Sequence, residues 1–487
     1  MAKKTAVVDL GSNSIRMVVF EKTSRFAFYI SKEYKRKIRL GENAYNNGKM
    51  LQEEAMEKAE NALLFLKKAA IKNKCKKVII IGTSALRDAP NSNYFINKIK
   101  NNLNLNIKCI DGKSEAYLGG LAALNLLSDI KNGTTLDIGG GSSELCLIKN
   151  GKIVDYISLD LGTVRLKEIF YDKNKIQDSY KFLDDAINSI PEHFKNENLI
   201  AIGGSLRAIS NSIMQKNSYP LKNLHDFRYK LEDEINYIKK ILDSKFENLS
   251  NYGIKKDRFD TIKEGIEIFL KISKKLNAKN IITSVVGIRE GVYIKDLLRP
   301  RLNFPPNFNP SLKSLQDRFL GEKTQIPNIA AKLFDLLKDM HKLNDYYKIL
   351  LINSAKICTI GNSLNFYFLN EHSSNFAIWG LNYGFSHKEK ILISTIIKLN
   401  GKKINPYLLE PYKNLLPEYK ILTWLNFLLA ISKTLSDNFD DEKLEFKLIN
   451  NNLHIKKTNK CAFNTQKSEL KKIFKPNDIN IFLDKTY

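Results

Sequence analysis

Two aspartates in this chain are each followed by a glycine-containing turn and a second apolar run. The segments are VVDLGSNSIRMVVF, which contains Asp9, and TLDIGGGSSELCLI, which contains Asp137. A glycine turn after a buried strand brings backbone N–H groups close to a phosphate, and one or two carboxylates with phosphate oxygens suit Mg²⁺. We therefore expect a phosphate site in which Asp9 and Asp137 bind Mg²⁺. Its phosphate-binding candidates are Gly11, Ser12, Asn13, Ser14, Gly139, Gly140, Gly141 and Ser142.

Each of these turns also has a simpler explanation. A glycine turn between two strands is more often only a tight hairpin. Serine and asparagine side chains cap their own turns as readily as they donate to a phosphate. The recurrence of an aspartate at the same place in both segments favours the phosphate site.

Hydrolysis of a phosphate also requires an oriented water, and a carboxylate is the simplest general base where no histidine is at hand. None of the six histidines lies in these segments. The candidates are Glu115, near the start of an expected helix, and Glu144, just beyond the second glycine turn. Taken alone, Glu115 is explained by the helix dipole and Glu144 by a solvated strand position.

Arg87 follows a TSAL turn and could present forked donors to a phosphoryl group. The alternative for Arg87 is a surface salt bridge. The same two interpretations apply, with less support, to Arg16, Arg207, Arg258 and Arg289. The sequence has no GxxxxGK[ST] loop and no HExxH motif, which argues against a P-loop nucleotidase and against that class of zinc enzyme.

An internal repeat indicates how these residues are positioned. The two aspartate segments align with Asp9 on Asp137. A second repeat aligns IIIGTSALR, ending at Arg87, with AIGGSLR, ending at Arg207. Strands alternate with helices, so we expect an α/β fold in two duplicated halves, residues 1–125 and 126–300. The expected strands are 5–10, 15–22, 78–82 and 107–110, and the expected helices are 52–73, 114–127 and 287–298.

Beyond residue 300 the pattern changes. Prolines cluster between Pro300 and Pro310, as in a linker, and the periodicity then predicts an all-helical third domain, residues 301–487. The expected helices there are 329–343, 347–369 and 388–398, with a hairpin about residues 450–452 near the end.

The composition is that of a folded, strongly basic protein. Of 487 residues, 78 are basic and 52 acidic, which gives a net charge of +26, and 43% are hydrophobic. Such a charge attracts anionic partners, although a genome-wide base-composition bias would also enrich lysine. No run approaches the roughly 20 apolar residues of a membrane span, and no signal-peptide region precedes the first strand, so we expect a cytoplasmic protein with no membrane partner.

Seven motifs within residues 5–298 resemble the exopolyphosphatase/guanosine pentaphosphate phosphohydrolase family. In order they are VVDLGSNSIRMVVF, IGTSALRDA, DGKSEAYLG, LDIGGGSSEL, LGTVRLKEIF, AIGGSLRAI and VVGIREG. That family belongs to the actin, sugar kinase and heat-shock ATPase superfamily, whose ribonuclease-H-like halves are duplicated. The resemblance implies two actin-like half-domains with a cleft between them.

The resemblance also implies roles for individual residues. Glu115 in SEA matches the family's general base, and Arg87 in ALRDA matches its phosphate-binding arginine. Asp137 and Glu144 in DIGGGSSE match its metal-binding and catalytic acidic residues. In this chain Ser114 replaces a glutamate common in the family. The remaining matches are to phosphate-contacting loops, at Asp9, the GSNS turn, Gly203, Gly204 and Ser205, and to the alarmone contacts of some members, at Arg16 and Arg258.

The third domain resembles the HD-like domain of longer family members. SAKICTIG stands where a metal-binding domain has LLHDIG, so Cys358 and Thr359 replace the histidine and aspartate, while His372 is retained. The resemblance therefore implies a degenerate HD-like domain that extends the substrate channel or forms a homodimer contact, without a metal centre of its own.

Together these patterns predict a Mg²⁺-dependent hydrolase of terminal phosphoanhydride bonds. Its expected substrates are inorganic polyphosphate and guanosine pentaphosphate, which becomes guanosine tetraphosphate. Two alternatives are an ATP-using kinase or ATPase on the same scaffold, and a non-catalytic protein that binds polyphosphate or the alarmone. No module that reads nucleic-acid sequence is recognisable, so no sequence-specific nucleic-acid partner is expected.

Overall fold

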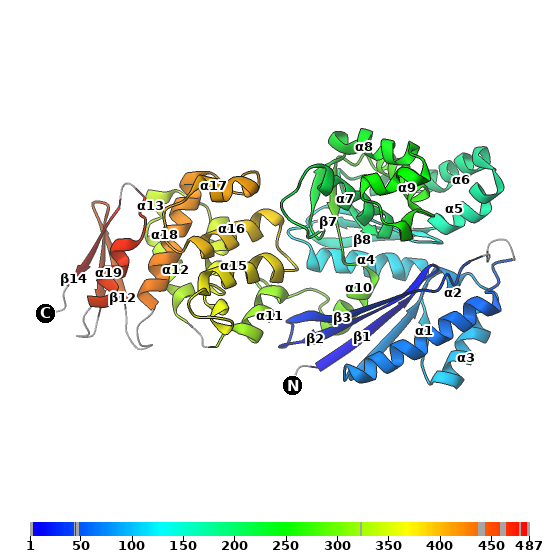
Figure 1. Ribbon diagram of the computed structural model, residues 1–487, viewed down its shortest axis with the longest axis horizontal. Helices are drawn as coiled ribbons and strands as arrows, with labels where there is room; N and C mark the ends of the chain where they lie inside the picture. The colour runs from blue at the N-terminus through cyan, green and yellow to red at the C-terminus, as the bar shows by residue number, and fades with distance from the viewer. Residues whose placement is uncertain are drawn as a thin grey trace. The chain divides into compact units, whose positions relative to one another are not determined.

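The computed structural model describes residues 3–42, 44, 48–321, 324–436, 444–457, 464–476 and 479–484 (Figure 1). Contacts divide the chain into two compact units, residues 1–308 and 309–487. The division falls in the predicted proline-rich break, since residues 298–309, all described, contain no helix or strand. The expected boundaries at residues 125 and 300 stay predictions.

A five-stranded sheet opens the first unit. β1 (Lys3–Leu10) and β2 (Ser14–Lys22) form the predicted antiparallel hairpin, and β4 (Lys77–Gly82) runs parallel to β1. β1 lies at the centre with Val7 and Val8 both buried, which explains its nearly continuous apolar sequence. The strand order is β3-β2-β1-β4-β5. The other elements are β3 (Phe28–Lys37), α1 (Glu53–Lys72), α2 (Ser84–Arg87), α3 (Ser92–Leu103) and β5 (Ile107–Cys109).

A six-stranded sheet repeats this plan. β6 (Gly133–Ile138) and β7 (Ser143–Lys149) form the second hairpin, and the order β8-β7-β6-β9-β11-β10 matches β3-β2-β1-β4-β5 position by position before its last strand. The internal repeat in the sequence is therefore a repeat of topology. The other strands are β8 (Lys152–Leu159), β9 (Asn198–Gly203), β10 (Arg228–Lys230) and β11 (Asn280–Thr283).

Helices α5 to α9 lie beside the second sheet (Figure 1). Leu206, Ile209 and Ile266 from these helices share a buried core with Leu136 and Leu145 of the hairpin. The helices are α5 (Thr163–Ile169), α6 (Ile176–Asn188), α7 (Gly204–Lys216), α8 (Leu231–Asp243) and α9 (Ile262–Lys275). Short 3-10 turns lie at Tyr171–Lys173, Glu192–Phe194, Phe246–Tyr252 and Lys256–Arg258.

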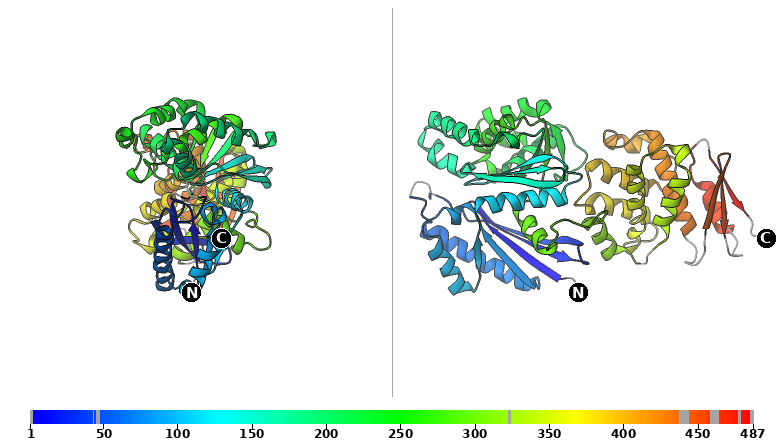
Figure 2. Two further views of the ribbon diagram at one scale, coloured as in Figure 1. Left: turned by 90° about the vertical axis from the view of Figure 1, so that its right-hand side faces the viewer. Right: turned by 180° about the vertical axis from the view of Figure 1, so that it is seen from behind.

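Two helices join the sheets, and both were predicted. α4 (Gly112–Leu126) packs on the second sheet through β7 and β8, α10 (Ile288–Leu297) packs on β1, and the two helices pack on each other. Glycine makes this packing possible. A Cβ on Gly291 would lie 2.0 Å from the carbonyl oxygen of Leu118. Figure 2 shows α4, in cyan, between the two sheets from behind.

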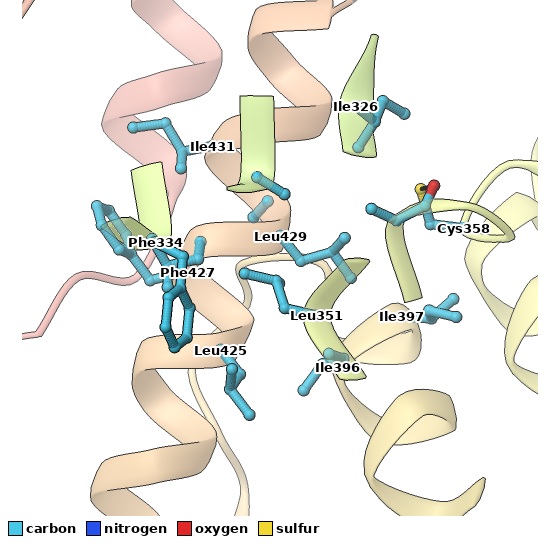
Figure 3. Packing of buried hydrophobic residues seen from close by; sticks show 14 of the residues in the cluster. Ile326, Phe334, Leu351, Cys358, Ile396, Ile397, Leu425, Phe427, Leu429 and Ile431 are labelled. Atoms are coloured by element: carbon cyan, nitrogen blue, oxygen red, sulfur yellow. Dashed lines mark hydrogen bonds between the residues drawn. The ribbon is translucent and has the colours of Figure 1, made fainter. Parts of the chain in front are cut away.

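The second unit is built mainly from helices. Its core contains Phe334, Leu351, Ile396, Leu425 and Phe427, drawn in Figure 3. The helices are α11 (Pro310–Phe319), α12 (Ile326–Leu336), α13 (Lys338–His341), α14 (Asp345–Ala355), α15 (Leu369–Gly380), α16 (His387–Leu399), α17 (Pro406–Leu409) and α18 (Tyr419–Ser436), with 3-10 turns at Ile360–Ser363 and Glu410–Tyr412. The predicted helix 388–398 is confirmed by α16, and that at 329–343 is split into α12 and α13.

The predicted single helix over 347–369 is wrong. α14 ends at Ala355 and α15 begins at Leu369. Between them the chain folds back so tightly that a Cβ on Gly361 would lie 2.3 Å from the carbonyl oxygen of Leu369. The misleading apolar residues, Phe366 and Tyr367 among them, are exposed rather than part of a buried helical face.

The expectation of an all-helical third domain is also wrong. The predicted hairpin is confirmed as β12 (Leu444–Ile449) and β13 (Asn452–Lys457), and β14 (Asn480–Asp484) adds a parallel third strand beside β13. α19 (Asn464–Lys472) lies between them in the sequence. Within the described part of the chain, no helix has the length and apolar character to cross a membrane.

Candidate active site

The two glycine turns are built in the same way. The amide of Gly11 donates to the carbonyl of Ser14 over 3.2 Å, and the amide of Gly139 donates to the carbonyl of Ser142 over 2.9 Å. The turns approach each other, because a Cβ on Gly140 would lie 3.2 Å from Cβ of Ser12. Among the described residues, the amides of Gly140 and Gly141 have no hydrogen-bond acceptor. Unpaired N–H groups in a glycine turn are suited to an anion.

One cavity, of about 180 Å³, lies between the turns. Nearly all the predicted site residues line it: Asp9, Gly11, Ser12, Asn13, Ser14, Arg16, Glu115, Asp137, Gly139, Gly140, Gly141, Ser142, Glu144, Gly203, Gly204, Ser205 and Arg258. Arg87 is the exception. It lies behind the cavity wall and contacts residues that line the cavity.

The buried end of the cavity holds the two candidate glutamates. Nη1 of Arg87 donates to Oε2 of Glu115 over 3.0 Å, Nη2 of Arg87 donates to Oγ of Ser142 over 3.3 Å, and Oγ of Ser158 donates to Oε1 of Glu144 over 3.0 Å. Glu115 occupies the first turn of α4, whose amino terminus is capped by the side chain of Asp111. The cap fixes the start of the helix and so the place of Glu115.

These two carboxyls have raised pKa values. Burial raises the pKa of Glu115 well above its usual range, the charge of Glu144 raises it further, and Arg87 opposes the rise. Burial likewise raises the pKa of Glu144, which its hydrogen bond with Ser142 partly offsets. Perturbed carboxyls of this kind, close together in a cavity, are typical of sites that handle protons.

Strand register fixes the neighbours of the two aspartates. Asp9 pairs with Arg16 across the first hairpin, and Asp137 pairs with Glu144 across the second. The repeat thus sets an arginine and a glutamate at equivalent positions. Because paired residues of antiparallel strands project to the same face, each partner points toward the cavity beside its aspartate.

Asp9 and Asp137 are two carboxyls of one cavity, and both have raised pKa values. Burial raises the pKa of Asp137 to about 6; Arg207 opposes this rise, and the charge of Asp9 adds to it. Burial also raises the pKa of Asp9, against the opposing charges of Arg289 and Arg16. Two carboxylates that destabilise each other in one cavity suit Mg²⁺, which commonly takes one or two protein carboxylates and fills its other positions with phosphate and water. Within the described residues no cluster of three or more His, Cys, Asp or Glu forms a complete protein cage for a metal.

The Gly203–Ser205 turn admits other groups at close range. Gly203 has φ +97°, and a Cβ there would lie 2.9 Å from Oδ1 of Asp137. A Cβ on Gly204 would lie 2.3 Å from Nη2 of Arg258. Any side chain at Gly204 would therefore displace the Arg258 guanidinium from the cavity wall.

Two arginines that the sequence supported only weakly also line the cavity, Arg207 and Arg289. Burial and repulsion from Arg289 lower the pKa of Arg207 to about 10, against the opposing charge of Asp137. Nε of Arg289 is buried and has no hydrogen-bond partner among the described residues. Guanidinium groups that repel one another beside a cavity favour an anionic ligand.

The sequence reasoning missed the cationic residues at the exposed end. Lys35 and Lys37 of β3 line the cavity, with 41% and 39% of their side-chain surface exposed. Lys35 lies 3.1 Å from Asp257, and Lys37 lies 3.6 Å from Asp260. We call Lys35, Lys37 and Asp257 the mouth of the cavity. Nothing in the charged run KEYKRK distinguishes these lysines from solvated ones.

Further lining residues went unremarked at the sequence level: Thr83, Ser84, Thr163, Thr261, Gly287 and Ile288. The second repeat, of IIIGTSALR with AIGGSLR, could have indicated two of these residues. It aligns Thr83 with Gly203 and Ser84 with Gly204, so the turn after β4 could have been assigned to the site with the turn after β9.

Sequence comparison relates the chain to known phosphatases. Residues 18–300, more than half of the chain, match the Ppx/GppA phosphatase family. The chain is 25% identical over 412 residues to a guanosine-5'-triphosphate,3'-diphosphate pyrophosphatase of Photobacterium profundum, covering 81% of this chain and 79% of that protein. It is 36% identical over 179 residues to a bifunctional 3-dehydroquinate synthase/phosphatase of Fusobacterium nucleatum, covering 35% of this chain and only 27% of that protein.

Solved structures share the fold of the first unit. An Aquifex aeolicus PPX-GPPA enzyme is 25% identical with a TM-score of 0.52, covering 61% of this chain and 100% of its own. An exopolyphosphatase from Cytophaga hutchinsonii is 22% identical with a TM-score of 0.56, covering 62% of this chain and 100% of its own, which is a likeness of fold.

Proposed function

We propose that this chain, which belongs to the Ppx/GppA phosphatase family and is a phosphoanhydride hydrolase, removes terminal phosphates from inorganic polyphosphate, guanosine pentaphosphate or both. One observation carries the proposal. Glu115 and Glu144 line the buried end of a cavity whose walls include both glycine turns. A terminal phosphate held by the turns would meet a carboxylate able to orient water at its outer face.

In this mechanism Glu115 is the general base. It accepts a proton from a water molecule as that water attacks the terminal phosphorus in line with the bridging oxygen. The new P–O bond forms as the bridging P–O bond breaks, and the shortened chain leaves with the bridging oxygen. Glu144, hydrogen-bonded to Ser158, helps to hold the water.

The phosphoryl oxygens are held by groups fixed before the reaction begins. Ser12, Asn13 and Ser14 of the first turn and Gly140, Gly141 and Ser142 of the second supply donors. Arg87 does not line the cavity; its hydrogen bonds hold Glu115 and Ser142 in place, and its positive charge is already fixed behind them when charge develops. Donors that need no reorganisation stabilise a transition state more than mobile ones.

Mg²⁺ is the proposed cofactor, with Asp137 and Asp9 as its protein ligands. When bound there, it would supply positive charge to neutralise phosphate oxygens. The fit rests on the raised pKa values of the two carboxyls, which burial causes and which a bound cation would offset.

The positive charge of the cavity lining supports a polyanionic substrate. Arg16, Arg207, Arg258 and Arg289 line its walls, and two lysines line its mouth. The name of the Photobacterium relative indicates the guanosine substrate and that of the Cytophaga structure indicates polyphosphate. We propose Arg16 and Arg258 as contacts for a guanosine polyphosphate.

The test is phosphate release from equal concentrations of long-chain polyphosphate, guanosine pentaphosphate and ATP, with and without Mg²⁺. We expect Mg²⁺-dependent release from one or both of the first two and much slower release from ATP. Faster release from ATP would favour a kinase or ATPase. Tight binding of polyphosphate with no release would indicate a binding protein.

A further inference from the structure

A second pocket, of about 490 Å³, adjoins the active cavity through two side chains. Arg87 and Ser158 line this second pocket. Each of them also makes a hydrogen bond to a residue that lines the active cavity, Arg87 to Glu115 and Ser158 to Glu144. The wall between the two spaces is therefore one layer of side chains.

The packing of Gly112 keeps this wall thin. A Cβ on Gly112 would lie 2.4 Å from Oγ of Ser158 and 3.7 Å from Cζ of Arg87. The backbone of α4 thus rests directly on both side chains, and a larger residue would push them aside. Arg87 does not line the active cavity, yet 20% of its side chain is exposed, so its free surface faces the second pocket.

The rim of the second pocket lies in solvent. Lys113, Asp160 and Ser189 are exposed and line it. The carboxylate of Asp160 lies 3.2 Å from Nη2 of Arg165, which offsets its charge. Asp111 also lines the pocket, and its carboxylate accepts from the amide of Ser114 as the cap of α4. The donors left for a small anion are the guanidinium of Arg87 and the ammonium of Lys113.

The mouth is a solvent-exposed part of the cavity, whereas the second pocket adjoins the catalytic glutamates through Arg87 and Ser158. Lys35 at the mouth is 41% exposed, whereas Glu144 at the inner end is 3% exposed. A polyphosphate that enters by the mouth puts its terminal phosphate at the inner end. After cleavage, the orthophosphate lies deeper than the remaining chain, and a chain that stays bound blocks the mouth.

We propose that the second pocket is the exit for orthophosphate, which passes between Arg87 and Ser158 while the shortened polyphosphate remains in the cavity. The proposal rests on the proposed function and adds a product route to it. The chemistry is unchanged, since water and the phosphoanhydride give one orthophosphate and a chain one phosphate shorter. Arg87 is held in the wall by Glu115 and Ser142, and its free surface would contact the departing orthophosphate on the side of the second pocket.

The test fills the pocket from its rim and compares two substrates. Ser189, the residue that follows α6, is exposed at the rim, so Ser189→Trp places a large side chain there. Lys181→Trp, at an exposed position within α6, is the control. Long-chain polyphosphate keeps the mouth blocked after each cleavage. Cleavage of tripolyphosphate gives orthophosphate and pyrophosphate. The short pyrophosphate then leaves and clears the mouth after a single cleavage.

We expect Ser189→Trp to lower kcat on long-chain polyphosphate by roughly five- to tenfold, with a burst of orthophosphate in the first turnover, because product release becomes rate-limiting. The same variant should keep its kcat on tripolyphosphate, and Lys181→Trp should behave as wild type on both. Equal losses on both substrates would mean that the pocket supplies water or supports the fold, and no loss on either would mean that product leaves by the mouth. Both results overturn the proposal.

A second variant tests charge instead of volume. Lys113→Glu sets a negative charge in the path of the phosphate, and Lys152→Glu makes the same change at the exposed start of β8. Selective slowing on the long chain by Lys113→Glu alone supports the exit, and identical behaviour of the two variants contradicts it. Absence of phosphate release from both substrates by the wild-type protein would be a failure of the proposed function itself, and the exit would fall with it.

Discussion

Nη1 of Arg87 donates to Oε2 of Glu115 over 3.0 Å, and the two side chains come from different helices, α2 and α4. Burial and the charge of Glu144 raise the pKa of Glu115, and Arg87 opposes them. A general base must be ionised to accept a proton. The contact with Arg87 therefore extends the pH range in which Glu115 can act.

Replacement of Arg87 by glutamine has two expected effects. It removes the donors that hold Glu115 and Ser142 in place and the positive charge behind them, which should lower kcat by roughly 10². It also lets the pKa of Glu115 rise further, so the fraction of ionised Glu115 at a given acidic pH falls and the acid limb of the kcat/KM profile moves to higher pH. A pH profile from 5 to 9 measures both effects. Arg87→Lys, which keeps the charge, should leave the acid limb close to that of the wild type, and an acid limb moved to lower pH in Arg87→Gln would contradict the assignment.

The raised pKa of Asp137 leads us to expect that its ionised carboxyl lowers the stability of the folded protein while it supports activity. Its carboxyl has a usual pKa of 3.8 and a pKa of about 6 in the folded protein. The folded state therefore binds the proton more tightly, and stability falls as pH rises from 3.8 toward 6 and stays reduced above that. Asp137→Asn carries no such charge, so at pH 8 without Mg²⁺ it should be more stable than the wild type by about 1–3 kcal/mol and inactive.

Urea unfolding at pH 8 in the presence of a chelator measures this difference. Below about pH 3 the two proteins should unfold alike, since Asp137 is then protonated in both the folded and the unfolded state. Added Mg²⁺ should stabilise the wild type and not the variant. A variant less stable than the wild type at pH 8 would show that Asp137 is an ordinary structural carboxylate.

The lysines of the mouth should control substrate capture. Lys35 pairs with Arg16 and Lys37 with Ser14 across β2 and β3, so both side chains share the face of those site residues. The double variant Lys35→Ala/Lys37→Ala should raise KM for long-chain polyphosphate by roughly tenfold, weaken its dependence on salt and leave kcat unchanged. Arg36→Ala is the control, because Arg36 lies over the ring of Phe65 at 4.1 Å from its centroid. If Arg36→Ala changed KM and its salt dependence as much as the double variant does, only the net charge of the protein, and not the mouth, would control capture.

The hairpins and the joining helices could be predicted because burial shapes their sequences directly. β1 is a central strand with apolar residues toward both faces, β6 is a central strand that is buried along nearly its whole length, and α1 has a regular buried face of alanines and leucines. β3 escaped prediction because most of its residues after Phe28 are at least partly exposed, and SKEYKRK has no apolar alternation. The break between α14 and α15 depends on the backbone approach at Gly361, which no local pattern records.

Much of the site could be predicted because its residues lie in the internal repeat of the sequence. Asp9 and Asp137 recur with their glycine turns, and a recurrence can be read in one sequence. The hydrogen bond of Arg87 to Ser142 depends on how the two halves pack, and its hydrogen bond to Glu115 and the placement of the mouth lysines depend on tertiary contacts within the first half. These relations join segments far apart in the chain, so spacing alone could not indicate them.

The most direct measurement compares Glu115→Gln with the wild type for both turnover and binding of polyphosphate. Glu57→Gln, the same change at an exposed position of α1, is the matched control. Glutamine keeps the shape and loses the capacity to accept the proton, so phosphate release should fall by at least ~10² while the affinity for polyphosphate is nearly unchanged. Turnover at the wild-type rate in Glu115→Gln would contradict the assignment of Glu115 as the general base.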